Sequence, residues 1–420
     1  MNRIQENKPI IKYVIYNIFS KGLAALAQLY AIYIFTRMHT KDEAAIIFIL
    51  LGYAIWFQLF ELGISQVLQN KFNTKLISLR GMIAVALAHL LFMWALAIFI
   101  LNSNFSTELL LPIKMDGIEG RATSVAFSMG ASILIVASNN LITQRILLVL
   151  NRGQMASTIT IIQSLLAVLG LASYELIDKA DLTIAVVLYL GPQVIVHIPL
   201  LASLMMKLVR RAPRIKKYDN SVAFVKDCLA YWAAGLLSTI YLGLDYYFAA
   251  HYLTSEQVVS YHLATRLFFI SYIVYYSFVL HRARRLSYLA FVGKTNIVNT
   301  IFKDSIFIGL VAVLVVYCLG NLLEFFGAFD LITNGVGINY LTLFCSFIYF
   351  MVRVFRDVAL VIAGGIGEKK VLYKFYSLEL IVGLSIMPLI VSEYNVVGIF
   401  MSMTLACTAG LIGLFAGLKN

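Results

Sequence analysis

Long apolar runs dominate the chain and leave room for little other than membrane-spanning helices. A helix that crosses a bilayer needs about 20 mostly apolar residues, and windows of that length recur along the sequence. We predict twelve spans, over residues 13–36, 44–70, 82–101, 122–147, 156–173, 183–206, 222–250, 257–280, 304–323, 339–363, 371–391 and 396–418. The alternation over about 10 residues that is typical of membrane β-barrel strands does not occur. The sequence therefore predicts an all-α polytopic membrane protein.

The composition excludes a soluble protein. Of the 420 residues, 61% are hydrophobic and 13% are charged, whereas a soluble domain carries about 25% charged residues. Half the usual charge cannot cover the surface of soluble domains of this size. The four cysteines lie far apart, without CxxC or Cys–His spacing, so neither a metal site nor a disulfide framework is predicted. No cofactor is indicated.

The distribution of lysine and arginine predicts the orientation in the membrane, because these residues collect in cytoplasmic loops. With the N-terminus in the cytoplasm, most of the 33 lysines and arginines fall in segments on the cytoplasmic side. The segments on the opposite side hold Arg37, Lys41, Lys114, Arg121 and Lys179. Both termini are therefore predicted to be cytoplasmic. The net charge of +12 then reflects topology rather than nucleic-acid binding.

A basic segment at the midpoint, which contains RRAPRIKK, divides the chain into two predicted lobes. We predict an N-lobe, a basic cytoplasmic linker and a C-lobe over residues 1–206, 207–221 and 222–420. A shift of 213 residues pairs Gly22 with Gly235 and Glu43 with Glu256, which favours an internal duplication. Each half has an even number of predicted spans, so the repeats would be parallel, as in some known transporters.

Four stretches of the sequence resemble motifs of one transporter superfamily, in the order expected and over nearly the whole chain. They are FELGISQVLQNK (60–71), RILLVLNRG (145–153), LTSEQVVSYHLATRLF (253–268) and EYNVVGIFMSMTLA (393–406). The superfamily is that of the multidrug/oligosaccharidyl-lipid/polysaccharide (MOP) exporters, and the chain is most similar within it to the bacterial O-antigen flippases (Wzx). Val259 and Ala45 depart from the pattern, since family members often carry glycine there.

The resemblance implies a fold and a function. The twelve helices would form two six-helix lobes around a central cavity, and the protein would not be an enzyme. Its substrate would be an undecaprenyl-diphosphate-linked oligosaccharide, moved outward across the bacterial cytoplasmic membrane by alternating access. The expected partners are this glycolipid, membrane lipid, H+ or Na+ as a coupling ion, and a glycan polymerase with a chain-length protein.

Three alternative functions would each leave a different mark on the sequence. A multidrug cation antiporter of the same fold should line its cavity with carboxylates. An integral-membrane glycan polymerase or glycosyltransferase would need a sizeable outer loop or an acidic motif at an interface, and the predicted loops are short. A purely structural scaffold would not explain arginines inside the membrane.

Seven ionisable residues inside the predicted spans are the candidate site residues. A charge at mid-bilayer is costly, so it usually faces a partner or a water-filled cavity. The candidate cations for the diphosphate are Lys21, Arg266, Arg353 and Arg356. The candidate ion-pair or coupling carboxylates are Glu61, Asp245 and Asp357. Arginine binds phosphate bidentately and lysine as a point charge. No metal-ligand spacing occurs among them.

Two acid–base pairs are predicted at matching depths. At a rise of about 1.5 Å per residue, Lys21 and Glu61 lie roughly 13 Å from the cytoplasmic side. By the same rule, Asp245 and Arg266 lie ~9–14 Å below the outer side. Each pair is either a closed salt bridge that fixes helix packing or a cavity-facing cation with a carboxylate that substrate displaces. Both interpretations stay open on the sequence.

The tenth predicted span carries three charges on one helical face: Arg353, Arg356 and Asp357. An internal pair between Arg353 and Asp357 is the structural alternative to a role in the cavity. Arg356 would then need a partner or a wet cavity, and we expect it to line one.

Overall fold

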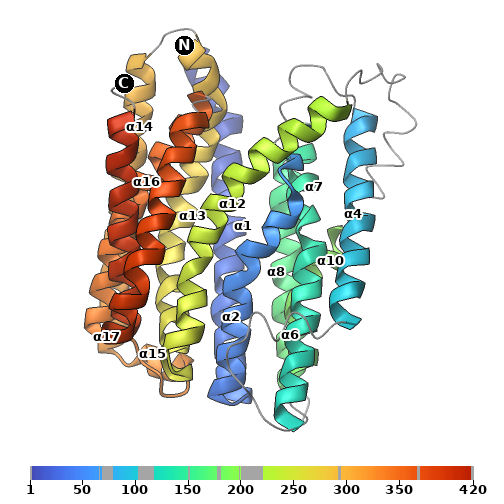
Figure 1. Cartoon of the computed structure of the whole chain (residues 1–420), viewed down its shortest axis with the longest axis vertical. Helices are drawn as coiled ribbons and strands as arrows, with labels where there is room; N and C mark the ends of the chain where they lie inside the picture. Colours follow the sequence, from blue (N-terminus) through green and yellow to red (C-terminus); the bar gives the residue numbers. More distant parts are fainter. Residues whose placement is uncertain are drawn as a thin grey trace. The chain divides into compact units, whose positions relative to one another are not determined.

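Helices make up all the regular structure of the described residues. The computed structural model describes residues 2–65, 67–68, 79–102, 118–149, 152–176, 181–197, 199, 221–291, 295–366 and 369–417. Within these ranges no strand occurs (Figure 1). The predicted all-α fold class is confirmed.

The helices of the described residues follow one another in chain order. In the first half they are α1 (Asn2–Met38), α2 (Lys41–Phe57), the 3-10 helix η1 (Gln58–Glu61), α4 (Leu79–Asn102), α6 (Ile118–Ala137), α7 (Asn139–Val149), α8 (Gly153–Glu175), α9 (Leu182–Leu190) and α10 (Pro192–Ile195). In the second half they are α12 (Ser221–Tyr252), α13 (Ser255–Phe291), α14 (Thr295–Phe325), α15 (Ala328–Ile332), α16 (Tyr340–Ile366) and α17 (Lys369–Gly417).

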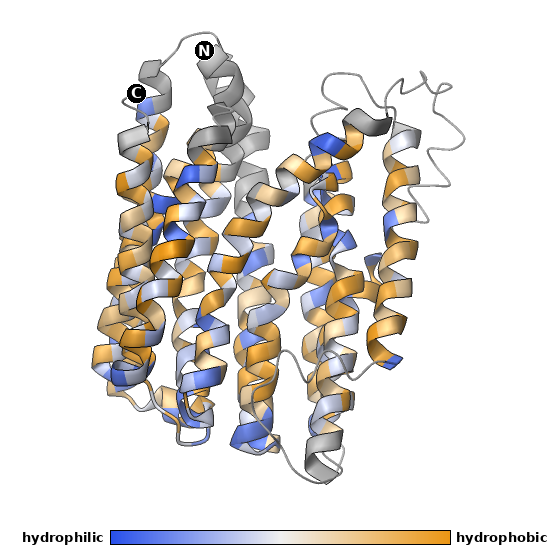
Figure 2. Cartoon of the chain, viewed as in Figure 1, coloured by the Kyte–Doolittle hydropathy of each residue, from blue (hydrophilic) through white to orange (hydrophobic). Residues whose placement is uncertain are grey.

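Nine helices in the described part of the chain are long and apolar enough to cross a membrane. One of them, Leu372–Leu414, runs over 43 residues and is broken at Asn395, so it covers most of the last two predicted spans. The predicted sixth span corresponds to a shorter apolar helix, Leu182–Ile195. Hydrophobic residues fill most of the helices' length, and hydrophilic ones lie at the lower helix ends and at scattered places along the helices (Figure 2). The protein is a multi-pass membrane protein, and the exact number of twelve spans stays a prediction.

The chain divides into two compact units. One unit joins Met1–Ala45 to Ile240–Asn420, and the other is Ile46–Thr239. Residues 207–220 of the predicted linker lie outside the described residues. The division into an N-lobe and a C-lobe stays a prediction.

Helix α13 is central to the unit formed by Met1–Ala45 and Ile240–Asn420. It packs against α1, α14 and α16, and α16 packs against α17. The rings of Phe268 and Phe350 are fully buried and stack at 5.3 Å between their centroids, so they join α13 to α16. By contrast, α14 exposes Phe307 and Val315, at 69% and 61%. These apolar side chains are suited to face lipid.

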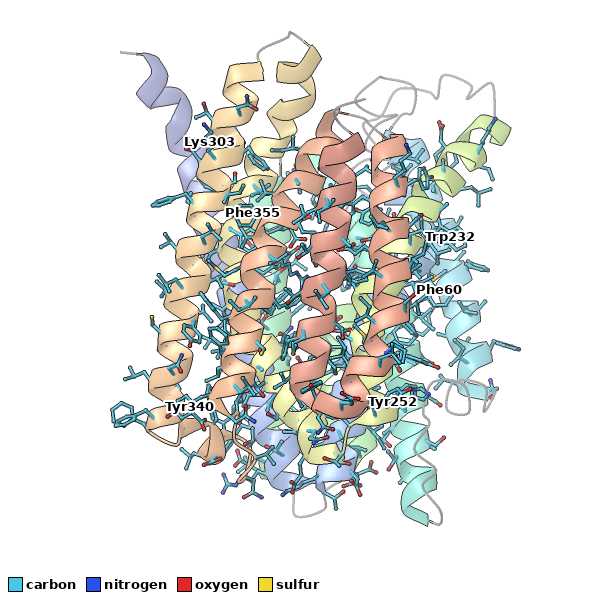
Figure 3. The ribbon with its side chains drawn as sticks, turned by 60° about the vertical axis from the view of Figure 1, so that its left-hand side comes forward. Phe60, Trp232, Tyr252, Lys303, Tyr340 and Phe355 are labelled. Carbon is cyan, nitrogen blue, oxygen red and sulfur yellow. The ribbon has the colours of Figure 1, made fainter. Side chains whose placement is uncertain are left out.

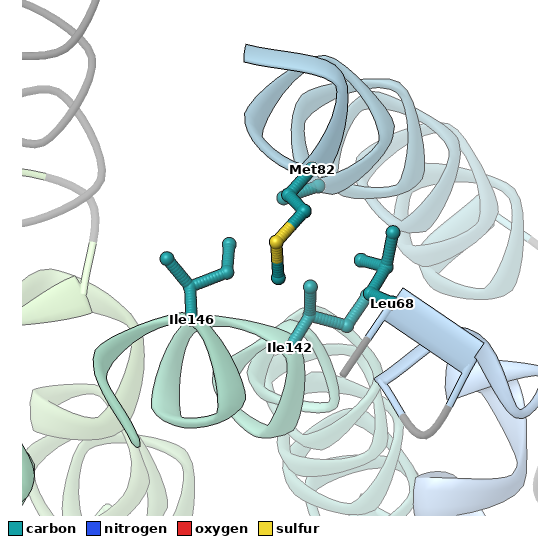
Figure 4. Packing of buried hydrophobic residues seen from close by; sticks show 5 residues of the cluster. Leu68, Met82, Ile142 and Ile146 are labelled. Carbon is teal, nitrogen blue, oxygen red and sulfur yellow. The ribbon is translucent and has the colours of Figure 1, made fainter. Parts of the chain in front are cut away.

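The unit Ile46–Thr239 is built around α6, which packs against α4 and α9. A separate buried cluster joins α4 and α7 to the segment that follows η1. Leu68, Met82, Ile142 and Ile146 form this cluster, and each is 0% exposed (Figure 4). It fixes the positions of the helices that hold Glu61 and His89.

A tight turn inside α17 reverses the chain between the last two predicted spans. Asn395 adopts φ 53° and ψ −128°, a backbone conformation that favours glycine. Three residues later, a Cβ atom on Gly398 would lie 2.5 Å from the carbonyl oxygen of Ile390 and 2.9 Å from Cα of Val391. The absence of a side chain at Gly398 therefore allows the two helical segments to approach closely.

Replacing Gly398 with alanine is expected to lower the free energy of unfolding by about 1–3 kcal/mol, because backbone atoms must move to admit the methyl group. Reversible unfolding in mixed micelles measures the change. Gly22→Ala is the matched control, since a Cβ atom there meets nothing within 4 Å. Equal stability of the two variants would show that the close approach at Gly398 does not matter.

Candidate functional site

Arg266 on α13 joins the two long helices α1 and α13. Its Nε donates to Nε2 of His262 at 3.3 Å, and its Nη1 donates to Oε1 of Gln28 on α1 at 3.4 Å. A guanidinium only donates, so Nε2 of His262 accepts and the ring proton lies on Nδ1. That Nδ1 is 2.7 Å from the hydroxyl of Tyr246. Arg266 thus donates to an imidazole on its own helix and to an amide on α1.

Asp245 on α12 is buried and is held by uncharged groups. Its Oδ2 accepts from the hydroxyl of Tyr261 at 2.5 Å, and its Oδ1 accepts from the backbone N–H of Tyr246 at 2.8 Å. Both members of the predicted pair, Asp245 and Arg266, therefore have other partners in this structure. Their roles in binding or coupling stay predictions.

Lys21 on α1 lies beside α13, half-buried. Its ammonium is 5.6 Å from the centroid of the Tyr276 ring, within range of a cation–π interaction. Nearby, the amide of Asn17 donates to the hydroxyl of Ser277 at 3.0 Å. Together with the contact between Gln28 and Arg266, these pairs show that α1 runs antiparallel to α13 and places Lys21 and Arg266 along one seam. We call this the α1–α13 seam.

Four charged residues form a closed network between α16 and α17. Nε of Arg353 is 3.4 Å from Oδ2 of Asp357, and Nη1 of Arg356 is 2.8 Å from Oδ1 of Asp357. Arg356 also binds Glu379 bidentately, with Nε and Nη2 at 2.6 and 2.9 Å from the carboxylate oxygens. Arg356 and Glu379 are 3% and 0% exposed. Two cations and two carboxylates thus neutralise one another inside the membrane.

This network corrects one expectation and confirms one contact. The alternative contact between Arg353 and Asp357 occurs as predicted. Of the two settings open to Arg356, a partner or a wet cavity, we expect the cavity; the structure instead shows a partner, Glu379, and a side chain that is 3% exposed. Glu379 is missing from the charges that we singled out inside the predicted spans. Its signal in the sequence was an acid in the middle of an apolar run.

Glu61 lies where the helix that begins with α2 is broken. The 3-10 helix η1 ends at Glu61, and Leu62 and Gly63 follow with φ 55° and 70°. The backbone N–H of Ser65 donates to the Glu61 carboxylate, which therefore caps the turn that resumes after the break. Lys21 belongs to the other unit, so its predicted pairing with Glu61 stays a prediction.

Side chains of neighbouring helices satisfy the carbonyl groups that the break sets free. Trp232 on α12 donates to the oxygen of Leu59 at 3.0 Å, and His89 on α4 lies 2.8 Å from the oxygen of Phe60 (Figure 3). Lipid cannot bond these carbonyl groups, so partners from neighbouring helices stabilise a broken helix inside a membrane. His89 is also 3.1 Å from Oδ1 of Asn139 on α7.

The turns before α2 and before α13 are built alike and contact each other. Both are reciprocal capping boxes: Thr40 with Glu43, and Thr254 with Gln257. Across the turns, Lys41 binds Glu256 and Ser255 donates to Asp42. Both helix starts and both boxes are offset by 214 residues, one more than the predicted shift of 213. We call this contact the paired turns.

The residues described offer no evident metal centre. No group of three or more His, Cys, Asp or Glu residues that could hold a metal ion occurs among them. The four candidate cations differ in the kind of group that they contact. Arg353 and Arg356 bind carboxylates, whereas Lys21 and Arg266 lie against aromatic, imidazole and amide groups.

Comparisons with known proteins agree on the kind of molecule. A Salmonella typhi protein described as "Putative O-antigen transporter" is 21% identical over 408 residues, covering 92% of this chain and 90% of its own. The lipid II flippase MurJ, in an inward closed conformation, matches with a TM-score of 0.70 and 14% identity, over 98% of this chain and 88% of its own. An inward-facing multidrug resistance MATE family transporter of the MOP superfamily matches with a TM-score of 0.70 and 14% identity, over 94% of each chain. No protein-family model matches the chain.

These findings confirm the resemblance predicted from the four motifs. The chain has the fold of MOP superfamily transporters, and the protein most like it in sequence among those named is described as an O-antigen transporter. The proteins it resembles are transporters and a flippase rather than enzymes.

Proposed function

We propose that this multi-pass membrane protein, with the fold of the MOP superfamily transporters, is a flippase for a lipid-linked oligosaccharide. Its substrate is an undecaprenyl-diphosphate-linked repeat unit of O-antigen or a related surface polysaccharide. The protein moves this substrate from the inner to the outer leaflet of the bacterial cytoplasmic membrane by alternating access. The likeness in sequence to the Salmonella typhi protein over 92% of the chain supports this substrate class.

The observation that carries the proposal is the pair of half-buried cations in the α1–α13 seam. Arg266 donates to Gln28 and His262, and a diphosphate is a stronger acceptor than either of them, because its oxygens are charged. Lys21 adds a second positive charge further along the same seam. A diphosphate headgroup carries negative charge on two phosphates, so two cations along one seam suit it.

The other candidate residues take different roles in this proposal. Arg356 and Glu379 hold α16 to α17, and Arg353 lies between this network and the ring of Tyr272. Asp245 is the carboxylate proposed to couple transport to H+ or Na+, since its partners are a hydroxyl and a backbone N–H rather than a cation. Glu61 supports the break after α2.

The proposed setting follows from the charge distribution. The excess of lysine and arginine in alternate loops supports two cytoplasmic termini. A glycan polymerase and a chain-length protein would consume the flipped substrate on the outer side. The rival with the same fold, a multidrug cation antiporter, is disfavoured because a cationic drug would meet Lys21 and Arg266 in the seam.

A deletion strain without redundant flippases tests the proposal. We expect diphosphate-linked repeat units to accumulate in the membrane while glycan disappears from the cell surface. Mass spectrometry of extracted lipids and surface-glycan staining measure the two quantities, and the wild-type gene supplied in trans should restore both. Normal surface glycan with unchanged lipid intermediates would contradict the proposal and favour drug export.

A further inference from the structure

Three aromatic rings form a continuous ladder on one face of α13. Phe269, Tyr272 and Tyr276 are spaced three and four residues apart, which places them on neighbouring turns of one helical face. Their centroids are 4.9 Å apart from Phe269 to Tyr272 and 4.8 Å apart from Tyr272 to Tyr276, with interplanar angles of 23° and 19°. All three side chains are half-buried. We call them the aromatic ladder.

Cations adjoin the ladder along its length. Lys21 lies over the Tyr276 ring at 5.6 Å, and the guanidinium carbon of Arg353 lies 5.3 Å from the centroid of Tyr272. Arg266 stands one helical turn before Phe269 on the same helix. The ladder therefore adjoins the α1–α13 seam at Tyr276 and α16 at Tyr272, and along α13 it follows Arg266 and ends beside Lys21.

The polar neighbours of the ladder indicate that it does not face lipid. Lys21, Gln28 and Arg266 lie in the seam that it adjoins, and charged groups inside a membrane face a partner or water rather than hydrocarbon. The surface of this unit that suits lipid carries exposed apolar side chains instead, such as Phe307 and Val315 of α14. Half-buried rings beside cations suit a polar ligand with apolar patches.

Sugar rings have that chemistry. A pyranose presents C–H groups on its faces and hydroxyls around its rim, and the face of an aromatic ring carries partial negative charge that attracts such C–H groups. Tyrosine hydroxyls can also hydrogen-bond the rim. Core aromatics of the same helix lie on another face, where Phe268 and Tyr275 are 0% exposed and serve packing.

We propose that the aromatic ladder of Phe269, Tyr272 and Tyr276 packs, through the parts of its rings that neighbouring side chains leave uncovered, against the sugar rings of the substrate headgroup, while Lys21 and Arg266 hold its diphosphate. This inference rests on the proposed function and adds to it the surface that recognises the oligosaccharide. Packing of this kind tolerates changes in hydroxyl configuration, so the ladder recognises sugars as a class rather than one sugar.

The test compares two probes on the full-length protein in nanodiscs. One probe is undecaprenyl diphosphate carrying the repeat-unit oligosaccharide purified from the deletion strain, and the other is undecaprenyl diphosphate without sugar. The measured quantity is the ratio of the two dissociation constants. Tyr272→Leu and Tyr276→Leu are expected to reduce the preference for the glycosylated probe about 3- to 10-fold each, and Tyr276→Phe, which keeps the ring, is expected to retain it.

Two further variants separate the ladder from the cations and from general packing. Lys21→Gln and Arg266→Gln should weaken both probes and leave the ratio unchanged. Tyr317→Leu removes a half-buried tyrosine of α14, whose ring centroid lies 4.5 Å from that of Phe347. Tyr317 is not part of the ladder, so this variant should leave the ratio unchanged.

The outcomes distinguish this inference from the function it rests on. If the wild-type protein binds undecaprenyl diphosphate but shows no preference for the glycosylated probe, the ladder does not recognise sugar, whereas diphosphate recognition stands. The same conclusion follows if the leucine variants keep the full preference. If the wild-type protein binds neither probe, both the inference and the proposed function are wrong.

Discussion

Replacing Glu379 with glutamine is expected to lower the free energy of unfolding by about 3–5 kcal/mol, because Arg356 would then be a buried cation without its bidentate partner. Glutamine keeps the shape of the side chain, so the loss measures charge rather than a cavity. Asp357 cannot compensate alone, since it also binds Arg353. Equilibrium unfolding in mixed micelles, followed by circular dichroism, gives the value.

The matched control for this loss is Glu256→Gln. Glu256 binds Lys41, but the two side chains are 61% and 46% exposed. An exposed pair contributes about 0–1 kcal/mol, so this variant should unfold close to the wild type. The double variant Arg356→Leu with Glu379→Leu should recover most of the stability, because an apolar pair replaces the buried ions without leaving a charge. A double variant as unstable as Glu379→Gln would contradict this account.

Replacing Arg266 with glutamine is expected to reduce translocation about 10- to 100-fold, because charge-assisted hydrogen bonds contribute about 1.5–3 kcal/mol. Translocation by Arg266→Lys should lie between that of the wild type and that of Arg266→Gln, since lysine keeps the charge but loses the bidentate geometry. Surface glycan per molecule of correctly inserted protein, in the complemented deletion strain, measures the effect. Lys21→Gln should give a loss of the same kind.

The control cation for these variants is Lys303. Its side chain is exposed on α14, outside the α1–α13 seam (Figure 3). Lys303→Gln removes the same charge as Lys21→Gln and should transport normally. If Arg266→Gln and Lys21→Gln also transport normally, recognition of the diphosphate by these cations is wrong. Because Arg356 is committed to Glu379, its loss would report on folding instead.

The helical architecture follows closely from the sequence, because in lipid the backbone must satisfy its own hydrogen bonds. Runs of about 20 apolar residues therefore predict helices well. The pairing of Arg356 with Glu379 could also be predicted from the sequence. Arg356 lies ten residues before the end of α16 at Ile366, and Glu379 lies ten residues after the start of α17 at Lys369. Equal distance from one turn places both at one depth.

Depth alone did not predict the partners of Asp245 and Arg266. Equal depth leaves open which face each helix turns toward its neighbour, and that depends on packing between helices distant in sequence. Tyr261 and Tyr246 bind the carboxylate, and Gln28 comes from a helix more than 200 residues away. Neutral partners of this kind leave no charge pattern in the sequence. The aromatic ladder cannot be predicted from the sequence either, because aromatic residues are common in every span.

The paired turns have the geometry of a homodimer interface within one polypeptide. Under the offset of 214 residues, Lys41 corresponds to Ser255 and Asp42 to Glu256, so the contact of Lys41 with Glu256 is the counterpart of the contact between Ser255 and Asp42. Such an isologous contact is self-complementary about a two-fold axis. A movement of one turn about that axis therefore changes the two contacts in the same way. Each contact is formed by the same two positions of the repeat, so one polypeptide carries both halves of a symmetric interface.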